Sequence, residues 1–103
     1  MSEDVAQTII ELTPPKHGED LDPELLGLLK AALRPGSAET THAATAAVVS
    51  RLRFADSRTR LRALLLCNWL FLRSRGVREL LVPLLPVRVS RVLRLALHAD
   101  SSD

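Results

Sequence analysis

The side chains with most catalytic potential in this sequence are three histidines and one cysteine. His17, His42 and His98 lie in different segments, and none forms a metal-ligand or catalytic pattern with a cysteine or a carboxylate. Cys67 is the only cysteine, which excludes an intrachain disulfide and a cysteine-rich zinc site, and its leucine neighbours predict a buried, unreactive thiol. The four glycines form no phosphate-binding loop. We therefore expect no catalytic residues, no cofactor and no metal.

Arginine is the more informative residue type. Residues 1–50 hold three basic residues against eight acids, whereas residues 51–103 hold eleven basic residues, all arginine, against four acids. Arginine prefers planar partners that accept two hydrogen bonds, such as a carboxylate or a phosphate. Three partners for the basic half therefore remain open: an acidic protein segment, a nucleic acid, and the acidic half of the same domain.

The only tryptophan lies within this arginine-rich region. Counting 100° per residue along a helix places it half buried, beside a leucine-rich face formed by Leu61, Leu64, Leu65, Phe71 and Leu72. An indole stacks on guanidinium groups, and tryptophan with arginine is the composition enriched in binding hot spots. The alternative is a core indole covered by a neighbouring helix. The candidate protein-binding residues are Arg58, Arg62, Trp69 and Arg73.

A second candidate surface lies near the end of the chain. A last helix is expected to begin near Pro83 or Pro86 and to run to about Ala99. One side of this helix carries a stripe of basic residues opposite an apolar side. The stripe either binds an acidic partner or is simply exposed to solvent. The stripe consists of Arg88, Arg91, Arg94 and His98.

Five or six short helices are expected to position these residues. Leucine and alanine dominate, and no segment alternates apolar and polar residues over the length of a strand, so the predicted fold class is all-α. A first helix is expected at residues 3–13, ended by Pro14 and Pro15. The second begins with Asp22 as N-cap and Pro23 at its first position. Its predicted apolar face is Leu25, Leu28, Leu29, Ala32 and Leu33.

The third and fourth helices carry the interior of the predicted domain. Ser37 is expected to cap an alanine-rich interior helix that runs to about Leu52. The central helix is expected at residues 57–74, with Ser57 as N-cap and with Arg73, Arg75 and Gly76 at its end. Since residues 63–72 are apolar on almost every side, several neighbours should pack against this helix. A short helix to about Val82 follows.

The chain length of 103 residues predicts a single domain. We expect one helical module at residues 1–100, with helices stacked antiparallel as a superhelix or a bundle, and a polar tail at 101–103. The acidic start lacks the features of a secretory signal. The apolar run at 63–72 contains Asn68 and is shorter than the roughly 20 residues of a membrane span. These features predict a soluble intracellular protein.

The sequence also resembles a known family, the N-terminal region of UV-stimulated scaffold protein A. The resemblance covers about residues 5–97. Its most specific part is Leu-Phe-x-Arg-Ser, followed at a fixed distance by Arg-x-Leu-Leu-Val. The matching residues are 11–13, 21–24, Arg60, Leu61, Ala63, Leu70, Phe71, Arg73, Ser74, Arg78, Leu81 and Val82.

The resemblance implies a fold similar to the VHS/ENTH class of helical superhelices, here incomplete. It implies a non-catalytic nuclear, chromatin-associated scaffold in transcription-coupled nucleotide excision repair. The implied partners are stalled RNA polymerase II, Cockayne syndrome repair proteins and a ubiquitin-specific protease. The family's segment that meets the repair factor TFIIH and its C-terminal region have no counterpart, so we expect a fragment or a short isoform. Trp69 stands where the family is expected to have a polar or acidic residue.

Two other functions stay open at the level of sequence. A basic helical module can bind nucleic acid, but Phe54, Trp69 and Phe71 are few for a stacking surface, and no helix-turn-helix pattern is present. A VHS-like fold is also compatible with an adaptor that binds ubiquitin or sorting signals, although fold alone does not fix function. No membrane partner is expected.

Overall fold

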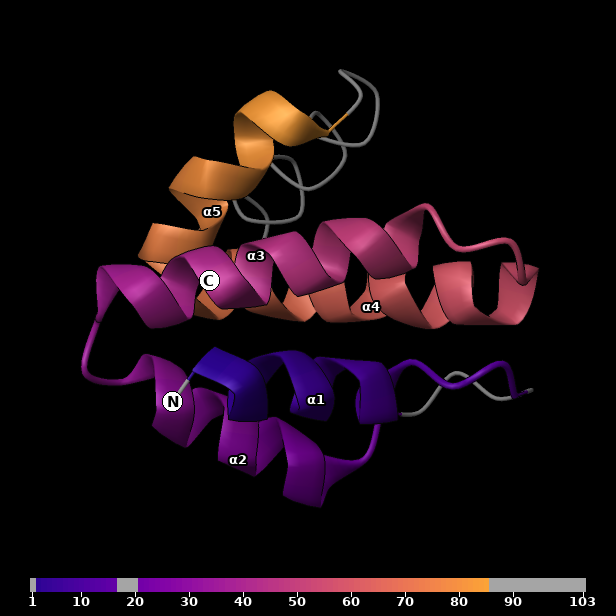
Figure 1. Ribbon diagram of the computed structural model, residues 1–103, viewed down its shortest axis with the longest axis horizontal. Helices are drawn as coiled ribbons and strands as arrows, with labels where there is room; N and C mark the ends of the chain where they lie inside the picture. Colours follow the sequence, from indigo (N-terminus) through magenta and orange to yellow (C-terminus); the bar gives the residue numbers. More distant parts are fainter. Residues whose placement is uncertain (1, 17–20, 86–103) are drawn as a thin grey trace, which may run out of the picture.

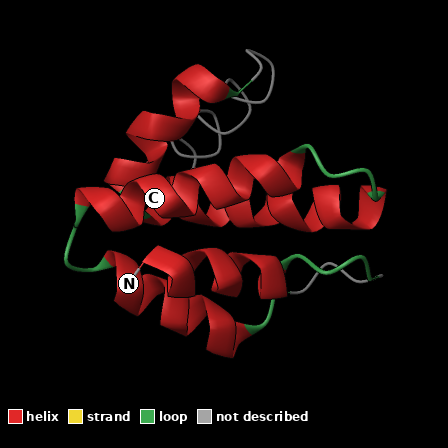
Figure 2. Cartoon of the chain, viewed as in Figure 1, coloured by secondary structure: helices red, strands yellow, loops and turns green. Residues whose placement is uncertain are grey.

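The computed structural model describes residues 2–16 and 21–85. This part contains five α-helices and no strand (Figure 2), which confirms the all-α prediction. The helices are followed by one 3-10 helix, η1 (Val82–Leu84). The α-helices are α1 (Ser2–Leu12), α2 (Pro23–Leu33), α3 (Ala38–Leu52), α4 (Ser57–Arg73) and α5 (Arg75–Leu81).

The helices are arranged in two layers (Figure 1). Helices α1 and α2 run antiparallel in one layer, and α3 and α4 form an antiparallel pair in the other. Helix α5 leaves the end of α4 at a steep angle and packs on α3. Helix α3 contacts each of the other four helices. The alanine-rich helix is therefore the interior helix, as its small side chains predicted, and it holds the centre that the sequence had assigned to α4.

The core forms where these helices meet. Helix α1 contributes Val5 and Ile9, whose spacing places both on one face, and its last residue Leu12 is buried beside them. Helix α4 contributes the largest fully buried side chain, Phe71. All five helices therefore supply core residues, and the remaining ones are Leu29, Ala44, Val48, Leu66, Cys67, Leu70, Val77, Leu81 and Leu85.

Two of the three predicted helix caps are confirmed. The Asp22 carboxylate accepts a hydrogen bond from the backbone N–H of Glu24 at 2.9 Å, and the Ser37 hydroxyl accepts one from Thr40 at 3.5 Å. The predicted cap Ser57 is wrong by one residue. Asp56 is the N-cap of α4 because its backbone is extended and its carboxylate accepts from the N–H of Arg58 at 2.9 Å.

The predicted end of α4 at Ser74 lies within one residue of the observed end, but Gly76 is not the residue that stops the helix. The chain turns at Ser74, which has an extended backbone and whose hydroxyl accepts a hydrogen bond from the N–H of Val77 at 3.3 Å. Ser74 therefore ends α4 and caps α5 at the same position. Gly76 lies inside α5, where a glycine lets that helix approach Thr41 of α3 closely.

The buried faces of two helices differ from the prediction. Leu28 of α2 is 60% exposed, whereas Leu26 packs against the core. In α4, Leu61 and Leu64 are 45% and 40% exposed, and the buried side instead contains Leu66. Both helices are apolar around most of their circumference, so sequence periodicity could not choose the side that faces the neighbours.

Residues 63–72 form the middle of α4, and other helices cover part of their circumference. Ala63 and Leu70 have no exposed surface, while Leu64 is 40% exposed. This agrees with the expectation that several neighbours pack against α4.

None of the helices in residues 2–16 and 21–85 combines the length and apolar character that a membrane-spanning segment needs.

Alanine is expected to affect the free energy of unfolding differently at Gly27 of α2 and at Gly76 of α5. Gly27→Ala is expected to raise the free energy of unfolding by about 0.5–1 kcal/mol, because a Cβ there meets nothing within 4 Å and alanine favours the helix. Gly76→Ala is expected to give no gain, because its Cβ would lie 3.1 Å from Thr41 Cγ2. Urea unfolding of both variants tests this. Equal stabilisation by both would show that α5 does not pack closely on α3.

Several expectations fall outside the described residues. They are the last helix from Pro86 to Ala99, most of the loop at residues 16–20, and the polar tail at 101–103. The division of the chain into one module and a tail therefore stays a prediction. The alternative start of the last helix at Pro83 is wrong, because Pro83 lies in η1 and the extended backbone of Leu85 interrupts any continuation. The first and second helices lie within one residue or two of their predicted bounds.

Candidate protein-interaction site

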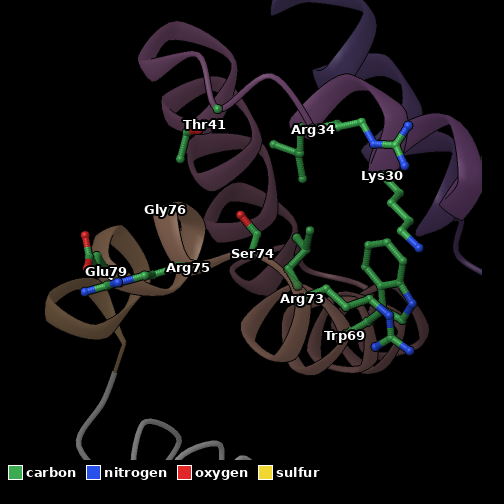
Figure 3. A pocket seen from close by; sticks show the side chains of 12 residues that line it. Lys30, Arg34, Thr41, Trp69, Arg73, Ser74, Arg75, Gly76 and Glu79 are labelled. Atoms are coloured by element: carbon green, nitrogen blue, oxygen red, sulfur yellow. Dashed lines mark hydrogen bonds and ion pairs between the residues drawn. The ribbon is translucent and has the colours of Figure 1, made fainter.

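A cleft of about 470 Å³ lies where α2, α3, α4 and α5 meet (Figure 3). Its apolar lining comes from Leu33, Trp69 and Leu70. The turn after α2 and the start of α3 contribute Gly36 and Thr41. Cavities of this size accommodate a few side chains or a small ligand. The cleft exists because the junctions from α2 to α3 and from α4 to α5 lie next to each other.

Trp69 and Arg73 stand one turn apart on α4 and pair at the edge of this cleft. The Arg73 guanidinium carbon lies 5.0 Å from the centre of the indole ring, which is a cation–π contact. Trp69 is partly buried against the core, as the helical count predicted, and Arg73 is exposed. Of the four candidate residues predicted on α4, the structure therefore brings two together, Trp69 and Arg73.

The cleft has a positive rim. Lys30 and Arg34 come from the end of α2, and Arg73 and Arg75 come from the end of α4 and the start of α5. The single acid of the lining, Glu79, pairs with Arg75 at 3.1 Å (Figure 3). Four cations against one carboxylate leave the cleft with a net positive charge.

Arg58 lies apart from this cleft, at the start of α4. Its guanidinium donates two hydrogen bonds to the Asp56 carboxylate, from Nε at 3.0 Å and from a terminal nitrogen at 2.7 Å. The side-chain hydrogen bond from Arg58 lowers the pKa of Asp56 well below its ordinary value. Arg58 thus supports the N-cap of α4, and the structure does not place it beside Trp69.

Arg62 is also separate from the tryptophan. Its side chain is only 8% exposed, and its Nε donates to the carbonyl oxygen of Lys16 at 3.1 Å. Arg62 and Trp69 share one side of α4 on a helical count but stand two turns apart along it. Arg62 therefore joins α4 to the segment after α1, and little of it is accessible to a partner.

The other candidate residues, Arg88, Arg91 and Arg94, lie outside the described residues, so their role stays a prediction. Two ion pairs join residues that the structure describes, Arg58 with Asp56 and Arg75 with Glu79. Neither uses an acid from the first half of the chain. Within the described part, these pairs give no support to the idea that the acidic half neutralises the basic half.

Cys67 is a core residue, as predicted. It has no exposed surface, and burial raises the pKa of its thiol to about 11. The exposed His42 is the described histidine, and the other two lie in the parts not described. In residues 2–16 and 21–85 no group of histidine, cysteine and carboxylate side chains is arranged to hold a metal ion.

The thiol gives a direct probe of native packing. In the native protein Cys67 is expected to react with a disulfide reagent many times more slowly than an exposed thiol, because it is buried and protonated at neutral pH. In guanidinium chloride it should react at once. The absorbance of the released thiolate measures both rates. Equally fast labelling under both conditions would contradict the described core.

Three basic residues of the cleft, Lys30, Arg34 and Arg75, were not candidates at the level of sequence. They come from two helices that are far apart in the chain, and no spacing rule joins them. The available signal was weak: Lys30 and Arg34 flank the end of a predicted helix, where basic residues are common for helix-dipole reasons.

Comparison with known proteins decides the family. The family described as the UVSSA N-terminal domain matches residues 1–102 of this chain. The chain belongs to the UVSSA N-terminal domain family. The resemblance to the N-terminal region of UV-stimulated scaffold protein A is thereby confirmed. No curated protein and no solved structure matches the chain, so the likeness to the VHS/ENTH class stays a prediction.

Membership of the UVSSA N-terminal domain family gives a coarse functional frame. The family belongs to scaffold-type repair proteins of the UV response. Within that frame, the basic cleft beside Trp69 has the composition of a protein-binding site.

Proposed function

We propose that this chain is a non-catalytic scaffold module of transcription-coupled nucleotide excision repair. It links RNA polymerase II stalled at DNA damage to repair and deubiquitinating factors. Its partners are the polymerase, Cockayne syndrome repair proteins and a ubiquitin-specific protease, and its place of action is chromatin in the nucleus. The observation that carries this proposal is the family match over residues 1–102.

The structure supports an interaction role by its distribution of side chains. Several large apolar side chains remain accessible on different helices and on the loop between α3 and α4, namely Ile10, Leu28, Phe54, Leu61, Leu64 and Leu84. The cleft adds a partly buried tryptophan within a positive rim. Surfaces that combine accessible apolar groups with arginine and tryptophan are typical of protein interfaces.

Chromatin retention after UV irradiation tests this function. The chain, expressed with a tag, is expected to move into the chromatin fraction after irradiation and to return to the extractable fraction when RNA polymerase II is depleted. Immunoblotting of the two fractions measures the shift. Retention that does not change with irradiation, or that survives loss of the polymerase, would overturn the proposal.

Two phenylalanine variants provide the folding control for this experiment. Phe71→Ala removes the largest buried side chain, so retention should fall in step with the folded fraction that circular dichroism measures. Phe54→Ala changes a ring that is 42% exposed and should leave the fold intact. If a Phe71→Ala protein that is unfolded by circular dichroism were retained at the level of the unchanged chain, binding would not depend on the folded module.

A further inference from the structure

We infer that the cleft between α2 and α5 binds an acidic peptide segment of a partner protein. One apolar side chain of that segment enters the cleft, and neighbouring carboxylates pair with its basic rim. This inference rests on the proposed function, since it names the kind of partner segment that the scaffold module would hold.

The charge of the cleft favours an acidic ligand. Glu79 is already paired with Arg75 at 3.1 Å, which leaves three cations of the lining without a carboxylate partner among residues 2–16 and 21–85: Lys30, Arg34 and Arg73. Both Arg34 and Arg73 are exposed, so their guanidinium groups can each form the two parallel hydrogen bonds that a carboxylate accepts. A segment with two or three acids matches this rim.

The shape and lining of the cleft favour a peptide with an apolar side chain. Leu33 and Trp69, which are both partly buried, present apolar surface inside the basic rim. The volume of about 470 Å³ suits a few side chains, and it is small for the face of a folded domain. A phenylalanine between acidic residues would place its ring against this apolar surface and its neighbours at the rim.

The same lining disfavours a single-stranded nucleic acid. Trp69 is the aromatic residue of this cleft, and one face of its indole is already covered by Arg73 at 5.0 Å. Bases need accessible aromatic faces on which to stack. The peptide is therefore the occupant that the geometry supports.

Fluorescence titration of the whole chain tests the inference, because Trp69 is its only tryptophan. The probe is a short synthetic peptide in which one phenylalanine lies between glutamates, and the matched peptide carries glutamines instead. The glutamate peptide is expected to change the indole emission in a saturable manner. The glutamine peptide should bind about tenfold more weakly, because it cannot pair with the cations.

Two C-cap arginines give matched protein variants. Arg34 ends α2 at the cleft, and Arg53 ends α3 at the opposite end of that helix, roughly 18 Å beyond Thr41. Both are exposed, and glutamate at either position changes the net charge and the helix-end electrostatics alike. Arg34→Glu should weaken the peptide about tenfold, and Arg53→Glu should change its affinity less than twofold.

Three results would overturn the inference. They are equal binding of both peptides, equal loss in both variants, and displacement of the glutamate peptide by a single-stranded oligonucleotide that binds more tightly. Far-ultraviolet circular dichroism confirms that each variant is folded. The test is independent of chromatin retention: a cleft that binds no peptide in a chain still retained after irradiation removes this inference and leaves the proposed function standing.

Discussion

Replacement of Phe71 by alanine is expected to lower the free energy of unfolding by about 3–5 kcal/mol. Phe71 has no exposed surface and is the largest fully buried side chain of the described core. Its loss removes apolar burial and leaves a cavity beside Arg78, whose guanidinium carbon lies 5.6 Å from the ring centre. A domain of this size is stabilised by about 5–15 kcal/mol, so the variant should be largely destabilised. Thermal melting followed by circular dichroism measures the change.

Phe54 provides the matched control for this prediction. It also carries an arginine over its ring, with the Arg51 guanidinium carbon 4.3 Å from the ring centre, but 42% of its surface is exposed. Phe54→Ala should therefore cost about 1 kcal/mol or less. If the two alanine variants melted at the same temperature, the described core would be wrong at α4.

The second large effect is expected at Arg51, which joins the end of α3 to the end of α1. Its Nε donates to the Thr13 hydroxyl at 2.9 Å, and a terminal nitrogen donates to the Thr13 carbonyl oxygen at 2.7 Å. Thr13 is fully buried. Arg51→Met keeps much of the side-chain volume but leaves the carbonyl oxygen without this donor, so we expect a loss of about 2–3 kcal/mol.

Arg53 is the control for Arg51, because it stands two residues away and its side chain is exposed. Arg53→Met should change the free energy of unfolding by less than about 0.5 kcal/mol. Urea titration of both variants, followed by circular dichroism, gives the difference. Similar small losses in both would mean that the contact between α1 and α3 does not depend on the bond to Thr13.

The sequence was sufficient to predict the helices, because their signals are local. Asp22 with Pro23, and Ser37 after a proline and a glycine, mark helix starts by chemistry that acts within one turn. The cap of α4 was misplaced because Asp56 and Ser57 are adjacent and both are good caps. Only the backbone turn distinguishes them.

The site was less predictable, because it depends on packing between helices. Trp69 and Arg73 are one turn apart, so a helical count was enough to pair them. Arg62 lies on the same side of α4 by helical count, but its side chain extends to the segment after α1, where the carbonyl oxygen of Lys16 accepts its hydrogen bond. The contribution of Lys30 and Arg34 depends on α2 ending next to α5, and no local pattern in the sequence encodes that neighbourhood.

Affinity purification after UV irradiation is the most direct test of the central claim that this chain is a scaffold module at stalled RNA polymerase II. The tagged chain is purified from irradiated and unirradiated cells, and its partners are identified by quantitative mass spectrometry. RNA polymerase II and Cockayne syndrome repair proteins are expected to be recovered with the chain, in amounts that rise several-fold after irradiation. Recovery of neither, or equal recovery from both sets of cells, would contradict it.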